Sequence, residues 1–209
     1  MERTQRPDNP AGPPSRSPEG FETMYASTPP WDIGRPQPAF LELAQRGVLR
    51  GPVLDVGCGT GEHALMAAGL GLEATGIDTA PTAIAIAEGK ARERGLSARF
   101  LVCNALALTA LGEQFATVLD SGLFHVFDDD DRARYVDNLR AVIPAGGRYY
   151  MLCFSDRQPG DYGPRRVTQD EIRASFRTGW RVDAIETATM DLTLDPTGAR
   201  AWRATITRT

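Results

Sequence analysis

The residues best suited to chemistry form one glycine-rich turn, V-L-D-V-G-C-G-T-G, over residues 53–61. Gly57, Gly59 and Gly61 follow a GxGxG spacing directly after a short apolar segment. Glycines at this spacing let the backbone turn tightly and leave room beside a ligand that any side chain would fill. The turn therefore predicts a site for a nucleotide-like ligand, and a turn that serves only the fold is the alternative.

The charges around this turn select among such ligands. The dinucleotide fingerprint GxGxxG places a third glycine at position 62, where this chain has Glu62, whose carboxylate would repel a pyrophosphate. A nicotinamide oxidoreductase is therefore disfavoured. Asp55 can instead offset positive charge, directly or through a water molecule. S-adenosylmethionine carries an ammonium and a sulfonium and no phosphate, so it is the ligand that we expect.

Two further polar residues end the apolar segments that follow the turn. Asp78 comes after the second segment, where a carboxylate can accept hydrogen bonds from both ribose hydroxyls; a helix N-cap is its alternative role. Asn104 ends the third segment, where its amide offers a donor and an acceptor to the adenine edge. For Asn104 the alternative is a simple turn residue.

The fourth segment ends in the predicted catalytic residues, Asp120 and His125. Asp120 and Ser121 are expected at the carboxyl end of the sheet, where open parallel sheets bind their ligands. A neutral imidazole at His125 could accept a proton from a substrate nucleophile or orient it. The alternative is a loop histidine bonded to backbone. His63, just after the glycines, is interpreted as structural or as part of the cofactor shell.

The apolar segments alternate with helical patterns, which brings these residues to one edge of a sheet. Nearly continuous apolar strands separated by helices predict a parallel sheet covered on both faces, an α/β three-layer fold with right-handed crossovers. The expected strands are 53–57, 73–78, 98–104, 115–120 and 147–155, and the expected helices are 63–71, 80–95, a short stretch near 106, and 130–142.

The C-terminal part carries a further helix and two strands. The helix is expected from Thr168 to Phe176, with Glu171 completing a capping box. The strands are expected at 180–187 and 201–208, joined by D-P-T-G as a hairpin.

The segment before the glycine turn divides in two. Residues 1–20 are rich in proline and poor in apolar side chains, which predicts a disordered tail. Residues 21–50 alternate aromatic residues with Pro and Gly before a short amphipathic helix near 40–44, which predicts a lid. The cofactor-binding domain is expected over 51–209.

The composition of the chain limits the kinds of partner that it can be expected to bind. A chain of 209 residues with 42% hydrophobic content fits one globular domain, and a net charge of -4 disfavours nucleic acids and anionic membranes as partners. Three cysteines without CxxC spacing are interpreted as reduced thiols. Lacking an apolar signal peptide or spanning run, the protein is expected in the cytoplasm, as a monomer or homodimer. The acidic run 128–131 predicts a helix start, and no metal site is expected.

The motifs VLDVGCGTG, GIDTAPTAIAIA, CNAL, FATVLDSGLFHVF and PAGGRYYMLCFSD resemble, in order and spacing, those of class I methyltransferases. PWDIGRPQP and VLDSG look more narrowly like the thiopurine, thiol and halide methyltransferase branch and its bacterial small-molecule relatives. The resemblance implies a Rossmann-like, seven-stranded sheet of order 3-2-1-4-5-7-6 with strand 7 antiparallel.

The resemblance also implies where S-adenosylmethionine binds. Tyr25 and Trp31 would lie over the cofactor, because a sulfonium is attracted to an aromatic face. Packing of the entry helix is the alternative role of Trp31. The family commonly has Asp where this chain has Asn104, which would alter the adenine contact. The remaining cofactor contacts implied by the motifs are Asp55, Gly57, Cys58, Gly59, Thr60, Gly61, Asp78, Thr79, Ala105 and Asp120.

The expected activity is methyl transfer from S-adenosylmethionine to a small molecule, at a thiol, a halide or a heterocycle heteroatom. The chain lacks an N/D-P-P-Y/F motif after the fourth strand, which argues against exocyclic amines of nucleic-acid bases. Because the sulfonium is already a leaving group, aligning donor and acceptor is the main requirement. The alternatives are O- or N-methylation of a natural product and a non-catalytic sensor of S-adenosylmethionine.

Overall fold

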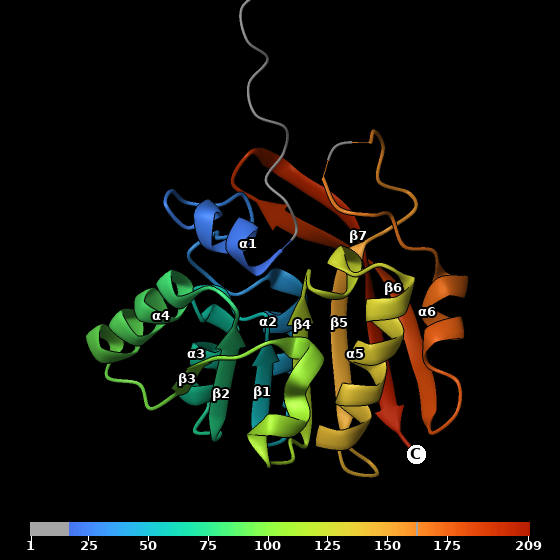
Figure 1. The fold of residues 1–209 in the computed structure, drawn as a ribbon, viewed down its shortest axis with the longest axis horizontal. Helices are drawn as coiled ribbons and strands as arrows, with labels where there is room; N and C mark the ends of the chain where they lie inside the picture. Colours follow the sequence, from blue (N-terminus) through green and yellow to red (C-terminus); the bar gives the residue numbers. More distant parts are fainter. Residues whose placement is uncertain (1–16, 162) are drawn as a thin grey trace, which may run out of the picture.

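The computed structural model describes residues 17–161 and 163–209. Residues 1–16 of the tail expected over 1–20 therefore lie outside the described residues. The fold is built on a seven-stranded sheet of order β3-β2-β1-β4-β5-β7-β6 (Figure 1). β7 runs antiparallel to both of its neighbours, whereas the other paired strands are parallel. This confirms the predicted sheet. The strands are β1 (Val53–Val56), β2 (Ala74–Asp78), β3 (Arg99–Val102), β4 (Thr117–Ser121), β5 (Arg148–Phe154), β6 (Trp180–Leu192) and β7 (Asp195–Arg208).

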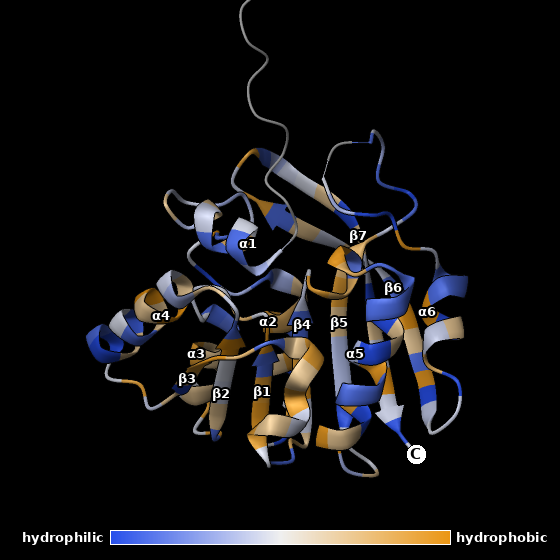
Figure 2. Ribbon diagram, viewed as in Figure 1, coloured by the Kyte–Doolittle hydropathy of each residue, from blue (hydrophilic) through white to orange (hydrophobic). Residues whose placement is uncertain are grey.

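Helices cover both faces of the sheet. One face packs against η1, α5 and α6, which lie in front of the sheet in Figure 1, and the other against α2, α3 and α4. The apolar colour in Figure 2 follows strands such as β1, while much of the α5 ribbon has the polar colour. The helices are α1 (Pro18–Met24), α2 (Pro38–Gln45), α3 (Glu62–Gly69), α4 (Pro81–Arg94), η1 (Ala105–Leu111), η2 (Phe124–Val126), α5 (Asp129–Val142) and α6 (Gln169–Ser175).

The helix boundaries follow local signals in the sequence. Gly95 ends α4 with a left-handed backbone at φ 62°, which residues other than glycine rarely adopt. Asp128 caps α5 and is followed by three acidic residues in its first turn, so the acidic run is the helix start that was predicted. Thr168 and Glu171 form the predicted capping box at α6.

The C-terminal hairpin differs from the prediction. β6 and β7 extend far beyond the expected ranges, and the turn between them lies at Thr193 and Leu194 rather than at D-P-T-G, which belongs to β7. The side chain of Asp195 accepts hydrogen bonds from the N–H and the hydroxyl of Thr197, so these two donors have partners within the segment. Proline and glycine are tolerated here because the segment lies at the far end of a two-stranded ribbon. The longer hairpin reaches the N-terminal segment, where Thr193 N–H donates to Pro30 O at 2.8 Å.

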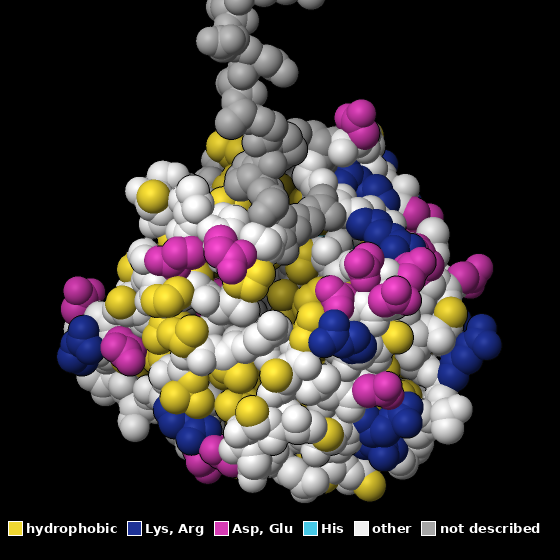
Figure 3. Space-filling view, in the orientation of Figure 1, with side chains coloured by type: hydrophobic (Ala, Val, Ile, Leu, Met, Phe, Trp, Pro, Cys, Tyr) yellow, Lys and Arg dark blue, Asp and Glu magenta, His cyan; other side chains and the backbone are white. Residues whose placement is uncertain are grey.

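The N-terminal segment lies across the carboxyl edge of the parallel strands, as the position of α1 in Figure 1 shows. α1 begins at Pro18, inside the stretch expected as tail, with Ser17 as its N-cap. Within 17–161 and 163–209, none of the helices combines the length and apolar character needed to cross a membrane. On the face in Figure 3, Lys and Arg mix with Asp and Glu over α5 and α6, so no basic patch forms there.

Candidate functional site

The glycine turn joins β1 to α3 at the carboxyl edge of the sheet. Gly57, Gly59 and Gly61 all have positive φ, at 66°, 52° and 87°. A Cβ on Gly61 would lie 2.7 Å from Phe100, and a Cβ on Gly59 would lie 2.8 Å from the hydroxyl of Tyr25. Gly61 therefore serves packing between α3 and the sheet, whereas Gly59 is needed where the N-terminal segment closes over the turn.

Asp78, at the end of β2, is hydrogen-bonded to the backbone of this turn. Its Oδ2 accepts the Gly59 N–H and its Oδ1 the Ala80 N–H, both at 2.9 Å. Burial raises the pKa of the Asp78 carboxyl, while these backbone N–H groups oppose the shift. A carboxylate has about four lone-pair sites, so Asp78 keeps capacity to accept from a ligand hydroxyl.

Asp55, in β1, is buried beneath the turn. Its Oδ2 accepts the Ala64 N–H at 3.1 Å, whereas Oδ1 has no hydrogen-bond partner among the described residues and lies 3.8 Å from Nδ1 of His63. Burial raises the pKa of Asp55 to about 8. An orphaned buried carboxyl oxygen beside a glycine cradle fits a ligand that brings positive charge, as the ammonium and sulfonium of S-adenosylmethionine would.

Glu62 does not face the glycine cradle as an unpaired anion. Arg94 binds its carboxylate with two hydrogen bonds of 2.8 Å, and Lys90 adds a third at 2.8 Å. Burial would raise the pKa of Glu62, but these bonds outweigh it and lower the pKa. The repulsion expected from Glu62 is therefore largely neutralised, and the missing third glycine remains the stronger sign against a dinucleotide.

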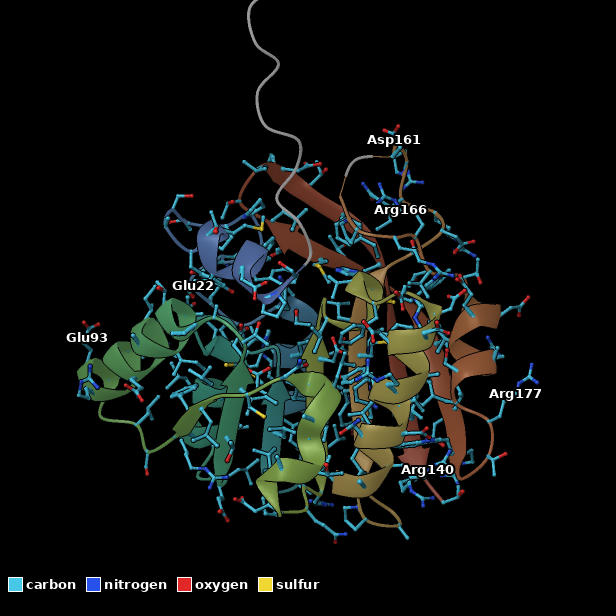
Figure 4. The ribbon with its side chains drawn as sticks, viewed as in Figure 1. Glu22, Glu93, Arg140, Asp161, Arg166 and Arg177 are labelled. Carbon is cyan, nitrogen blue, oxygen red and sulfur yellow. The ribbon has the colours of Figure 1, made fainter. Side chains whose placement is uncertain are left out.

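The N-terminal segment is docked on this site by polar contacts. Glu22 points from α1 toward the start of α4 in Figure 4, where its carboxylate accepts the N–H and hydroxyl of Thr82. Trp31 Nε1 donates to the hydroxyl of Tyr25 at 3.1 Å, so the two predicted aromatic residues meet each other as well as the turn. The structure thus places the N-terminal segment against the glycine turn.

A cavity lies between this segment and the turn. Several lining residues escaped prediction, namely Asp32, Ile33, Arg35, Gln37 and Met190. Asp32 accepts from the Thr60 hydroxyl at 2.9 Å and lies 3.9 Å from Nζ of Lys90. Four of the residues that escaped prediction belong to the segment W-D-I-G-R-P-Q, whose resemblance to the family could have indicated them. Met190 reaches the cavity because β6 extends beyond the range that its apolar pattern predicts. The lining residues that were predicted at or beside the site are Trp31, Gly57, Cys58, Gly59, Thr60, His63 and Ser121, and Glu62 completes the lining.

The other predicted cofactor residues lie around the same edge. Cys58 and Ala105 are buried, and Thr79 is half-buried beside Asp78. Asn104 is exposed, and its Oδ1 accepts the Leu106 N–H at 2.8 Å as the cap of η1. The turn role weighed for Asn104 is therefore present, and its amide nitrogen and the second lone pair of Oδ1 remain for a ligand.

Asp120, predicted as a catalytic and cofactor-binding residue, is enclosed by hydrogen-bond donors of the protein itself. It is fully buried in β4, and its Oδ2 accepts the hydroxyls of Tyr149 at 2.6 Å and Tyr135 at 2.9 Å. Its Oδ1 accepts the N–H groups of Leu123 and Phe124. Burial raises the pKa of Asp120 to about 6, opposed by these donors. The carboxylate anchors η2 to β5, and its catalytic and cofactor-binding roles stay predictions.

His125 follows on η2 and is buried. Its Nδ1 accepts the Phe154 N–H at 2.9 Å, and its ring packs edge-on against Phe154. The backbone-bonded histidine weighed as the alternative is thus present. His125 is nevertheless close to the cavity, because a Cβ on Gly122 would lie 3.3 Å from its Nε2 and 3.5 Å from Cε of the lining residue Met190.

Comparisons with known proteins agree with this geometry. Residues 53–147 match the family described as "Methyltransferase domain". The 2-heptyl-1-hydroxyquinolin-4(1H)-one methyltransferase of Mycobacteroides abscessus is 39% identical over 80% of this chain and 79% of its own. The chain belongs to the methyltransferases. It is a class I enzyme that uses S-adenosylmethionine to methylate a small molecule.

Two further similar proteins are named for sulfur groups. A solved structure entitled "Conversion of a Disulfide Bond into a Thioacetal Group during Echinomycin Biosynthesis" superposes with a TM-score of 0.83 and 38% identity, covering 92% of this chain and 93% of that one. The probable thiol methyltransferase 2 of Arabidopsis thaliana is 26% identical over 73% of this chain and 69% of its own. The methyltransferase therefore resembles proteins named for different acceptor atoms.

Proposed function

We propose that this methyltransferase transfers the methyl group of S-adenosylmethionine to an ionisable heteroatom of a small planar heterocycle. The observation that carries the proposal is the cavity under the N-terminal segment, whose apolar walls are Trp31, Ile33 and Met190 and whose polar groups include Ser121. The remaining side chains of the lining are mostly polar or charged, so the three apolar side chains would hold the face of a flat aromatic acceptor while polar groups surround its edge. The name of the relative from Mycobacteroides abscessus, a hydroxyquinolone methyltransferase, supports the same acceptor class.

The cofactor would lie along the glycine turn. In this proposal Asp78 accepts the ribose hydroxyls, Asp55 offsets the positive charge, and the ring of Trp31 lies against the sulfonium. When bound, S-adenosylmethionine supplies the methyl group, whose bond to the acceptor atom forms as its bond to sulfur breaks with the electron pair left on sulfur. The protein aligns the acceptor and excludes water, for which the docked segment from Tyr25 to Gln37 is suited.

A thiol is the second candidate acceptor. The two sulfur-related relatives favour it, and a thiolate needs no base at the site. A small acceptor of either kind fits the net charge of -4 better than a nucleic acid does, since polynucleotide binders depend on excess Lys and Arg.

Methyl transfer from labelled S-adenosylmethionine tests the proposal. The acceptor panel contains 2-heptyl-1-hydroxyquinolin-4(1H)-one, thiophenol and iodide, and Asp78→Ala serves as the cofactor-site variant. We expect the hydroxyquinolone to be the fastest acceptor and the variant to lose at least tenfold in affinity for S-adenosylhomocysteine by calorimetry. Faster transfer to thiophenol would favour the second candidate. Tight cofactor binding without transfer to any panel member would instead point to a sensor.

A further inference from the structure

The N-terminal segment holds His63 in one orientation and one tautomer. Nε2 of His63 accepts the Gln37 N–H at 3.1 Å, and the Phe40 ring packs edge-on against the imidazole with the ring centroids 4.8 Å apart. A peptide N–H can only donate, so Nε2 is unprotonated and the single proton of the neutral ring lies on Nδ1. The docked segment therefore makes Nδ1 of His63 a hydrogen-bond donor.

This donor faces the orphaned oxygen of Asp55. Nδ1 of His63 lies 3.8 Å from Oδ1 of Asp55, which has no hydrogen-bond partner among the described residues, and both side chains are buried. The separation is about 0.8 Å longer than a typical N–H···O hydrogen bond, so a small shift of either side chain would close it. A buried donor and a buried acceptor that face each other unpaired gain free energy when they meet.

The charges at the site determine when this contact forms. Burial, with the carboxylates of Asp120 and Asp78, raises the pKa of Asp55 to about 8. Burial also lowers the pKa of His63 to about 4, against the opposite effect of Glu62. In the free protein at pH 7, Asp55 is therefore mostly protonated and His63 is neutral. A bound cation favours the ionised form of Asp55 and disfavours an imidazolium, so the ligand produces a carboxylate beside a neutral donor.

We propose that His63 is a positioning residue for Asp55: when S-adenosylmethionine binds, Nδ1 of His63 donates a hydrogen bond to Oδ1 of Asp55 and fixes the carboxylate that offsets the charge of the cofactor. The inference rests on the proposed function in the role that this gives to Asp55. The proton that Asp55 loses goes to solvent, and the Nδ1 proton stays on the ring. Oδ2 keeps its bond from the Ala64 N–H, and each carboxylate oxygen has a second lone pair for the cofactor.

The same contacts couple the N-terminal segment to the cofactor. The Gln37 N–H selects the tautomer of His63 that can donate to Asp55, and the cofactor makes Asp55 the stronger acceptor. Because coupling between two binding events is reciprocal, the docked segment and the bound cofactor stabilise each other by the same factor.

A double-mutant cycle separates this positioning role from simple packing. His63→Phe keeps a ring against Phe40 but neither accepts nor donates a hydrogen bond. We expect it to weaken the binding of S-adenosylmethionine about tenfold by calorimetry at pH 7, as for the loss of a hydrogen bond to a charged group. In the Asp55→Asn background the same substitution should weaken binding less than about threefold, because the ionised acceptor is gone. A tenfold loss in both backgrounds would overturn the inference.

Thr82→Val is the matched control. It removes the hydroxyl that donates to Glu22, another contact that docks the N-terminal segment but does not involve Asp55. Its effect on affinity should be the same in the wild-type and Asp55→Asn backgrounds, whereas His63→Gln, whose amide can accept and donate, should retain most of the wild-type affinity. Equal non-additivity for Thr82→Val and His63→Phe would refute a specific role of His63.

Nitrogen-15 NMR of the wild-type protein does not depend on how the variants fold. His63 should be protonated at Nδ1 and not at Nε2, and its Nδ1 proton should move downfield when S-adenosylmethionine is added. A proton on Nε2, an imidazolium, or an Nδ1 proton that the cofactor leaves unchanged would refute the inference. None of these measurements requires methyl transfer, so absence of transfer to every acceptor of the panel would refute the proposed function alone.

Discussion

The backbone N–H of Gln37 donates a hydrogen bond to Nε2 of His63 at 3.1 Å. Gln37 is buried, and its side chain exchanges two further hydrogen bonds with the backbone of Asp191 in β6. One residue thus ties the N-terminal segment to α3 at the glycine turn and to the C-terminal hairpin. The segment cannot leave the site without breaking all three bonds.

Substitution of Gln37 by Leu should loosen this junction. The N–H and carbonyl of Asp191 would lose their partners, which costs about 1–3 kcal/mol for buried groups. We expect the denaturation midpoint to fall with an unchanged m-value, and hydrogen exchange over residues 30–37 to accelerate. The matched control is Gln45→Leu at the exposed end of α2, which should change stability by less than about 0.5 kcal/mol. Similar losses in both variants would mean that Gln37 does not hold the segment.

His63 should make the fold sensitive to acid. Burial lowers the pKa of His63 to about 4, below its usual 6.5, so the folded state favours the neutral ring. The stability that this contributes is present above pH 6.5 and is lost as the pH falls toward 4. His63→Gln retains an acceptor for the Gln37 N–H without titrating. The difference in melting temperature between wild type and variant should therefore shrink or reverse between pH 7 and pH 4.5. A difference that stays constant over this range would contradict the assignment.

Binding of S-adenosylmethionine should release a proton from Asp55. With a pKa of about 8, this carboxyl is mostly protonated at pH 7 in the free protein, and a cationic ligand favours its ionised form. Affinity should therefore rise with pH up to about 8, by at most roughly tenfold per pH unit. Calorimetry in two buffers of different ionisation enthalpy at pH 7 measures the released proton directly. In Asp55→Asn we expect weaker binding without proton release; release that persists would assign the proton to another group.

The alternation of strands and helices and the glycine turn could be predicted because both depend on local patterns in the sequence, whereas the strand order came from the resemblance to class I methyltransferases. The sequence could not predict the contacts of Asp120, since a carboxylate at the end of a strand looks the same in the sequence whether it faces a ligand or two tyrosine hydroxyls. Only the packing of α5 and β5 brings Tyr135 and Tyr149 to it. Gln37 and Met190 were missed for a related reason, because each gains its role from contact with a segment distant in sequence.

Trp31 offers a way to separate a charge effect from simple packing. Its ring lines the cavity, and an aromatic face attracts a sulfonium by about 0.5–2 kcal/mol but has no such attraction for the neutral thioether of S-adenosylhomocysteine. Trp31→Leu should therefore weaken the binding of S-adenosylmethionine more than the binding of S-adenosylhomocysteine. The ratio of the affinity for S-adenosylmethionine to that for S-adenosylhomocysteine should fall by roughly 2- to 30-fold. Trp31→Phe keeps an aromatic face and should restore most of the ratio, and Tyr25→Phe controls for the lost hydrogen bond between the two rings. Calorimetric titration of each variant with both ligands measures the ratio. Equal weakening of both ligands by Trp31→Leu would show that Trp31 only covers the site.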